Sequence, residues 1–243
     1  MKKAQILWLL ALPLACYQVV GESVTLQQAT ATYSQSLSGD FSVAKAVDHT
    51  IWDGLGWGIQ GQIGPQTAVF ETSANVGFSE GSFITFTLTQ AFIYWPQHTL
   101  GRFRLSVTQD DRNAFADGLA VNGDVSANWI VLRPHWLQTI NGTTLERLDD
   151  DSILASGPNA STDTYSLTAG TFLTGITGVR LEVIPDNSLP FGGPGRQPLN
   201  GNFVLSEFEM NVMAVPEPSI LSLGCVGGLI ALGIRGGFRR GRK

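Results

Sequence analysis

Short runs of alternating apolar and polar residues, separated by turn-forming residues, constrain the fold of this chain most strongly. In Ser82–Leu88 the apolar side chains recur at nearly every second position, and Leu100–Val107 repeats the pattern with Phe103 and Leu105 on one face. A period of two is that of a β-strand with one buried face, and no long stretch shows a helical period. Further strands are expected at Thr67–Glu71, Ile153–Ser156, Thr162–Leu167, Gly178–Ile184 and Asn202–Asn211.

So many short strands predict an all-β fold. Strands at this spacing, with Gly, Asn, Asp and Pro between them, are typical of two antiparallel sheets that pack face to face, and we expect a jelly-roll β-sandwich. Two segments interrupt the pattern. Gln109–Trp129 is rich in Asp, Asn and Ala, and Pro185–Leu199 is rich in Pro and Gly. Both are expected to be long surface loops.

Residues 1–21 have the features of a secretory signal peptide. Lys2 and Lys3 precede an apolar run that reaches Cys16, and small residues stand before a cleavage point near Gly21. The run is too short to span a bilayer comfortably. Two alternatives stay open. Cys16 could be lipidated, although Pro13 stands where a lipobox has a branched aliphatic residue, or the segment could remain as an uncleaved anchor.

Residues 214–243 form a tail of three parts. A Pro-Glu-Pro motif comes first, residues 219–234 are uncharged and rich in Gly, and residues 235–243 are basic. As a helix of about 1.5 Å per residue, the uncharged span would measure about 24 Å and would leave its basic end in the cytoplasm. The pattern is carried by Pro216, Glu217, Pro218, Arg235, Arg239, Arg240, Arg242 and Lys243.

This tail closely resembles the PEP-CTERM signal that exosortases recognise in Gram-negative bacteria that make exopolysaccharide. The resemblance implies signal peptidase and exosortase as processing partners, a transient inner-membrane intermediate, and delivery to the cell surface or extracellular matrix. The alternative is an ordinary C-terminal membrane anchor that follows a Pro-Glu-Pro turn. With both ends set aside, residues 22–213 are expected to form one β-sandwich domain.

Setting the ends aside also changes the charge. The whole sequence has 15 basic and 20 acidic residues, a net charge of −5, whereas from Glu22 to Glu217 eight basic residues face twenty acidic ones, a net charge of −12. This argues against a nucleic acid or an anionic membrane surface as partner and suits a neutral glycan, a cation or a basic protein. Both cysteines, Cys16 and Cys225, lie in the ends, so the domain can form no disulfide or cysteine zinc site.

Several blocks between residues 45 and 212 resemble an accessory β-sandwich of large planctomycete-type secreted proteins that also carry cytochrome-like haem domains. No Cys-x-x-Cys-His motif occurs here, so the resemblance does not extend to haem or electron transfer. A weaker analogy is to galactose-binding-like and discoidin-type modules, which implies sugar or surface binding by loop aromatics and a structural calcium ion. The blocks are His98–Thr108, Asp151–Gly157, Asp163–Tyr165, Gly175–Val183, Gly193–Arg196 and Asn200–Phe208.

Tryptophans in turns are the candidates for glycan contacts. Trp52 and Trp57 flank a Gly-rich turn, and Trp95 lies in a Tyr-Trp-Pro turn. An exposed indole beside polar groups is suited to stack on a sugar ring, but a large ring in such a turn can also cap the core. Arg196, in a Gly-Pro-Gly-Arg turn, is a further candidate ligand contact, with a structural role in the turn as the favoured alternative. Trp129 and Trp136 are weaker candidates of the same kind.

The long loop also contains a candidate calcium site. Asp110, Asp111 and Asp117, with Asp124 nearby, could supply the hard oxygen ligands that calcium requires, and Asp149–Asp151 offers a second acidic group. Neither spacing matches an EF-hand. The alternative for both is a solvated acidic loop.

Nothing in the sequence indicates catalysis. The three histidines, His49, His98 and His135, are far apart in sequence, and no nucleophile elbow or paired-histidine metal motif occurs. A pair of carboxylates for glycoside hydrolysis stays open because sequence does not reveal their separation. The sequence therefore favours a non-enzymatic, exported module that binds exopolysaccharide and needs no cofactor beyond the candidate calcium. A polysaccharide-processing enzyme and a purely structural matrix protein are the alternatives.

Overall fold

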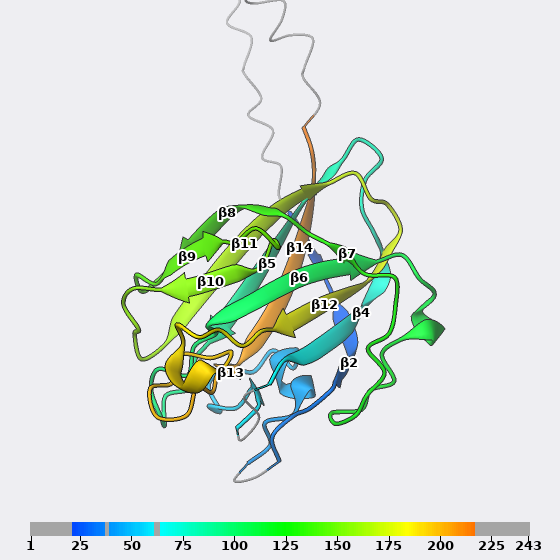
Figure 1. Ribbon diagram of the computed structural model, residues 1–243. Coiled ribbons are helices and arrows are strands. Elements are labelled where there is room, and N and C mark those ends of the chain that lie inside the picture. Colours follow the sequence, from blue (N-terminus) through cyan, green and yellow to red (C-terminus); the bar gives the residue numbers. More distant parts are fainter. Residues whose placement is uncertain (1–20, 37–38, 61–63, 217–243) are drawn as a thin grey trace, which may run out of the picture.

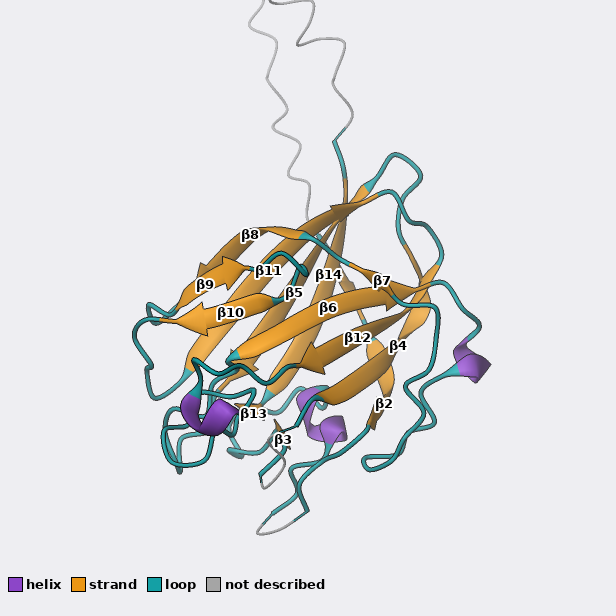
Figure 2. Cartoon of the chain, in the orientation of Figure 1, coloured by secondary structure: helices purple, strands orange, loops and turns teal. Residues whose placement is uncertain are grey.

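The computed structural model describes residues 21–36, 39–60 and 64–216. In this part of the chain, two antiparallel β-sheets pack face to face, and the helices are three short 3₁₀ turns (Figures 1 and 2). The expected all-β sandwich is thus confirmed. The predicted signal peptide, except for Gly21, and the predicted span and basic tail lie outside the described residues. None of the helices described is long and apolar enough to cross a membrane.

The first sheet has five strands, all joined by antiparallel pairing. Its central strands carry an almost perfect alternation of buried and half-buried residues, the period that the sequence showed. In order across the sheet the strands are β1 (Glu22–Val24), β14 (Glu207–Ala214), β5 (Ser82–Gln90), β11 (Asp163–Thr171) and β8 (Pro134–Thr139).

The second sheet has seven strands, of which six form its main path. The chain repeatedly crosses between the sheets, from β4 to β5, from β5 to β6, and from β10 through β11 to β12, which is the connectivity expected of a jelly roll. The order is β2 (Leu26–Ala31), β4 (Gln66–Val76), β12 (Ile176–Val183), β6 (Arg102–Thr108), β10 (Ile153–Ser156) and β9 (Thr144–Arg147), with β7 (Ile130–Val131) paired to β6.

Large side chains from the inner faces of both sheets fill the core. Phe86 on β5 stacks on Phe208 of β14 with ring centroids 5.8 Å apart, and Phe103 on β6 stacks on Tyr165 of β11 at 6.1 Å. All four rings are buried. Because the domain described here contains no cysteine, this packing and the sheet hydrogen bonds hold it together.

A third, two-stranded sheet closes one end of the sandwich. It pairs β3 (Trp57–Gly58) with β13 (Val204–Leu205) and lies beside the 3₁₀ turns η1 (Val43–Ala46) and η3 (Pro190–Gly192). The chain leaves β13 at once for β14, which runs to the opposite end, where it pairs with β1 (Figure 1). The expected strand at Asn202–Asn211 is therefore two strands.

The break between β13 and β14 falls at Ser206. The amide of Ser206 donates to the carbonyl of Thr89 at 2.8 Å, and its Oγ accepts from the amide of Ala91 at 3.1 Å. This residue thereby transfers the chain from the small sheet to the edge of β5. The sequence changes here from an apolar run, Phe203–Leu205, through two polar residues to the alternation that begins at Phe208.

Candidate functional site

A hollow of about 360 Å³ opens at the end of the sandwich that β3 and β13 close. It is bounded by four segments that are far apart in sequence: the residues after β2, the turn before β3, the loop after β5, and the turn before β13. Its aromatic side consists of Phe41, Phe92, Tyr94 and Trp95. Its polar side consists of Gln35, Gln60, His98, Asn200 and Asn202.

The aromatic side is a connected set of rings. Phe92 makes edge contacts with Phe41 at 5.6 Å, Tyr94 at 6.1 Å and His98 at 5.1 Å between ring centroids. Tyr94 and Trp95 are 67% and 63% exposed. The half-buried Phe92 therefore supports the exposed ring of Tyr94, which presents an apolar face to a ligand with little side-chain freedom to lose, and the exposed ring of Trp95 is its neighbour in the sequence.

Gly54 brings two turns of the sequence together on this side. Its φ of +68° favours glycine, and a Cβ at this position would lie 2.4 Å from Cε2 of Tyr94. The Tyr94 ring thus lies directly on the backbone of the turn that contains Trp52. The sequence marked these two turns as separate candidates, and the fold places them in contact.

His98 is held in one orientation and one charge state. Its Nδ1 lies 2.7 Å from the carbonyl oxygen of Trp95, and because a carbonyl only accepts, Nδ1 carries the proton. Burial lowers the pKa of His98, with the carbonyls of Trp95 and Pro96 opposing that shift. The ring is therefore neutral at pH 7, and its Nε2 is a hydrogen-bond acceptor.

The amides on the polar side are oriented by their own hydrogen bonds. Gln35 Nε2 donates to Gln60 Oε1 at 3.0 Å, and the amide of Gln60 donates to Gln35 Oε1 at 3.2 Å. Asn202 Oδ1 accepts from the amide of Ile59 at 3.2 Å. No Asp or Glu is found among the described residues that line the hollow. The site thus combines exposed rings with neutral donors and acceptors, which suits a ligand with apolar faces and hydroxyl groups.

The three tryptophans predicted to contact a glycan differ in burial. Trp95 lines the hollow, and Trp52, 80% exposed, lies two residues before Gly54 without lining it. Trp57 has no exposed surface; its Nε1 donates to the carbonyl of Tyr33 at 3.0 Å, and its ring contacts Phe203. The prediction of a sugar contact by Trp57 is therefore wrong, and the ring caps the core instead.

Arg196 also serves the fold and not a ligand. It is buried, and its guanidinium donates to Thr143 Oγ1 at 3.1 Å and to the carbonyls of Pro158 at 3.1 Å and Gly157 at 2.7 Å. These bonds tie the turn before β13 to the segment between β10 and β11. Arg196 therefore has the structural role that the sequence favoured over a ligand contact, because its Nη1 and Nη2 donate within the protein.

The predicted calcium site does not form. Among the residues described, no three His, Cys, Asp or Glu side chains gather closely enough to hold a metal ion. Asp110 accepts from the amide of Asn128 at 2.7 Å, Asp111 accepts from the amide of Asn113 at 2.9 Å, and Asp117 accepts from the amide of Asp124 at 3.1 Å. These carboxylates satisfy the backbone of the long loop and do not converge on one point, so the residues do not fit a calcium ion.

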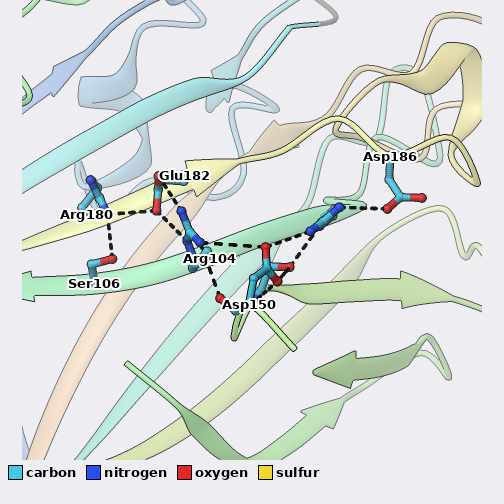
Figure 3. A network of polar contacts seen from close by, with 8 residues as sticks. Arg104, Ser106, Asp150, Arg180, Glu182 and Asp186 are labelled. Carbon is cyan, nitrogen blue, oxygen red and sulfur yellow. Dashed lines mark hydrogen bonds and ion pairs between the residues drawn. The ribbon is translucent and has the colours of Figure 1, made fainter. Parts of the chain in front are cut away.

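The second acidic group belongs to a charged network on the outer face of the seven-stranded sheet (Figure 3). Asp150 pairs with Arg102 at 2.9 Å and with Arg104 at 3.8 Å. Arg104 in turn forms a two-pronged pair with Glu182, which also accepts from Arg180 at 3.1 Å. The acids and arginines neutralise one another, and the network ties β6 to β12 and to the turn before β10.

Sequence reasoning missed part of the hollow. Phe92 and the glutamines Gln35 and Gln60 were not singled out, and His98 was considered only for catalysis. The cluster of three aromatic residues in Phe92–Trp95 was a usable signal. The glutamines gave none, because their role depends on contacts between segments that only the fold brings together.

No protein-family model and no curated protein matches the sequence. Among solved structures, the chain is similar to the family 32 carbohydrate-binding module from Streptococcus pneumoniae EndoD, at 12% identity and a TM-score of 0.43, over 77% of this chain and 98% of that one. It is similar to CBM32-3 of a Clostridium perfringens family 31 glycoside hydrolase, at 10% identity and a TM-score of 0.39, over 77% and 94%. It is also similar to a chain of Streptococcus pneumoniae β-galactosidase BgaA, at 10% identity and a TM-score of 0.43, over 80% of this chain and 92% of that one. Similarity this low assigns no site or ligand to this chain.

Proposed function

We propose that the protein is a non-catalytic module that binds a neutral sugar of an extracellular polysaccharide in the hollow. The single observation that carries the proposal is the pairing of the exposed rings of Tyr94 and Trp95 with fixed, uncharged polar groups in one cavity. A sugar ring has an apolar face for the aromatic side chains and hydroxyl groups for amides and a neutral histidine.

Charge supports the same ligand class. The segment from Glu22 to Glu217 has a net charge of −12, which would repel a polyanion, while the hollow itself has no carboxylate among its described lining residues. Glycoside hydrolysis by the common mechanisms requires a pair of carboxylates at the sugar. The lining therefore supports binding over the alternative of a polysaccharide-processing enzyme.

The test is binding of the native exopolysaccharide and of neutral oligosaccharides by calorimetry or a glycan array. We expect Trp95→Ala to weaken binding by about tenfold, the equivalent of about 1.4 kcal/mol for a lost stacking contact. Trp136→Ala is the matched control, because Trp136 is a similarly exposed indole on β8 that does not line the hollow. Equal losses in the two variants, or no binding by the wild type, would refute the proposal; the latter result would favour a purely structural matrix role.

We further propose that the tail delivers this module to the cell surface or matrix through exosortase. Pro216 is the last residue described, and β14 connects it to the end of the sandwich where the hollow lies. A chain held at its C-terminus would therefore present the hollow away from the point of attachment. Mass spectrometry of the mature protein tests the processing: residues beyond Ser219 would show that the uncharged span is retained.

A further inference from the structure

A buried carboxyl group lies close to the turn that forms one wall of the hollow. Glu207, the first residue of β14, is 4% exposed, and neither of its carboxyl oxygens has a hydrogen-bond partner among the described residues. The only basic group paired with it in that part of the chain is the largely exposed imidazole of His49, whose Nδ1 lies 3.6 Å from Oε1. An ionised carboxylate is costly in such a place, whereas a protonated carboxyl is tolerated.

The other charged groups nearby do not compensate this carboxyl. Lys45 of η1 is paired with Asp48 at 2.9 Å and with Asp53 at 3.4 Å. The pKa of Glu207 is raised to about 7, chiefly by burial; the nearby backbone amide of His49, which does not meet hydrogen-bond geometry, opposes the rise, and the charges of Glu209 and Asp48 contribute to it. On the neighbouring strand, β5, the residue opposite Glu207 is the uncharged Thr89.

The segment that bears His49 continues directly into the wall of the hollow. His49 itself adopts a φ of +60°, and the amide of Thr50 is held by Asp48 Oδ1 at 2.9 Å. Asp53 Oδ1 accepts from the amide of Leu55 at 3.0 Å. Residues 48–55 are thus a locally bonded unit, attached at one end to η1 through Lys45 and ending at the two residues, Gly54 and Leu55, that line the hollow.

Close backbone contact links the same segment to the strand before Glu207. A Cβ on Gly56 would lie 2.4 Å from the carbonyl oxygen of Leu205, so the chain passes directly over the end of β13. Tyr94 rests on Gly54 from the other side. A displacement of residues 48–55 would therefore move the support of an exposed ring of the hollow.

We propose that Glu207 and His49 form a pH-sensitive latch that holds residues 48–55 against β14 and so keeps the wall of the hollow in place. The protonated carboxyl remains buried and the segment stays closed. When Glu207 ionises, its charge requires water, and the segment opens to admit it. As a statement about sugar affinity, this inference rests on the proposed function; as a statement about the latch, it does not.

The direction of the pH effect follows from proton linkage. The closed form binds the proton of Glu207 more tightly than a solvated glutamic acid does, whose ordinary pKa is 4.5. Closure is therefore fully favoured below pH 4.5 and is lost as the pH rises through about 7. Between pH 6 and pH 8 the protonated fraction of such a group falls about tenfold.

The test measures the segment without any ligand. Amide hydrogen exchange of residues 48–55 in the purified protein, corrected for the intrinsic effect of pH, should show protection that falls by up to about tenfold from pH 6 to pH 8. Glu207→Gln should remove this dependence because the amide cannot ionise. Glu146→Gln is the control, since Glu146 is an exposed carboxyl on β9, in the other sheet, and its charge is not among those that shift the pKa of Glu207. The latch is overturned if protection of residues 48–55 in the wild type is the same at pH 6 and pH 8, or if it falls as much in Glu207→Gln as in the wild type.

Two further measurements separate the latch from the proposed function. A ¹³C carboxyl titration of unmodified protein should place the midpoint of Glu207 near 7, and a midpoint near 4.5 overturns the latch even if Glu207→Gln fails to fold. Binding of the native exopolysaccharide should then weaken from pH 6 to pH 8 in the wild type and stay constant in Glu207→Gln. pH-dependent protection with no sugar binding at either pH would support the latch and refute the proposed function.

Discussion

Two irregular regions, the aromatic loop at Phe92–Trp95 and the acidic loop at Gln109–Trp129, offer different residue types for a site, and only the first forms one. In the aromatic loop the half-buried Phe92 supports Tyr94, and the exposed side chains of Tyr94 and Trp95 line a hollow. In the acidic loop the carboxylates remain at least partly exposed and accept hydrogen bonds from backbone amides of their own loop.

The difference lies in what each loop needs in order to be ordered. A long loop without strands leaves backbone amides without partners, and Asp and Asn side chains supply them. These hydrogen bonds hold the carboxylates at separate points of the loop, and among the described residues no three acidic side chains gather into a cation site. Phe and Trp side chains offer no acceptor to a backbone amide, so a loop that is already held by packing can leave such rings free for a ligand.

The largest expected effect is a difference in unfolding free energy between variants of Trp52 and Trp57, which flank the Gly-rich turn beside the aromatic loop. Trp57→Ala should cost about 3–5 kcal/mol of unfolding free energy, because it empties a fully buried site under β3. Trp52→Ala should stay within about 0.5 kcal/mol, since Trp52 is 80% exposed. Urea unfolding of both variants measures the difference. Similar losses would show that burial does not distinguish these residues.

A smaller effect should appear in the pH dependence of stability. Because the folded-state pKa of Glu207 is raised from 4.5 to about 7, its contribution is present below pH 4.5 and is lost as the pH rises through 7. The loss amounts to about 2–3 kcal/mol. Between pH 4.5 and pH 8 the unfolding free energy of the wild type should fall by this amount more than that of Glu207→Gln, as measured from unfolding curves at the two pH values. Parallel pH profiles would contradict it.

Gly54 tests the contact between the Trp52 turn and the aromatic loop. Gly54→Ala should cost about 2 kcal/mol, from a positive φ and from the clash with Tyr94, and should weaken sugar binding. Gly142→Ala is the matched control: Gly142 also has a positive φ, +87°, but nothing lies within 4 Å of its Cβ position. It should cost about 1 kcal/mol and leave binding unchanged. Thermal unfolding and calorimetry decide between these outcomes.

The smallest effects belong to the acidic loop. Asp117→Ala should cost about 1 kcal/mol, because the amides of Leu119 and Asp124 lose their acceptors. Calcium should leave the Tm of the wild type unchanged, since the acidic side chains do not gather into a ligand set in the described chain. A rise in Tm with calcium that disappears in Asp117→Ala would reverse our comparison of the two loops.

The central strands could be predicted from the sequence, and the sheet edges could not. Ile153–Ser156 was predicted with its observed bounds, and the strand at Ser82–Leu88 differs from β5 by two residues. Six strands in the described part of the chain were not predicted: the two-residue strands β3 and β7, and β1, β2, β8 and β9, which are the four edges of the two sheets. Edge strands are short and partly exposed, so they lack the alternation by which buried strands are recognised. Thr144–Arg147, with one apolar residue, is an example.

The sequence by itself determined the fold class, because a period of two across many short segments admits little besides packed antiparallel sheets. It also predicts the sorting tail, a prediction that lies almost wholly outside the described residues. Only the tertiary structure decided which tryptophan is buried and which is exposed, since Trp52 and Trp57 flank the same Gly-rich turn, and burial depends on what packs against each ring. It likewise decided that Tyr94 meets Gly54 and that Glu207 meets His49, because contacts between distant segments leave no local pattern.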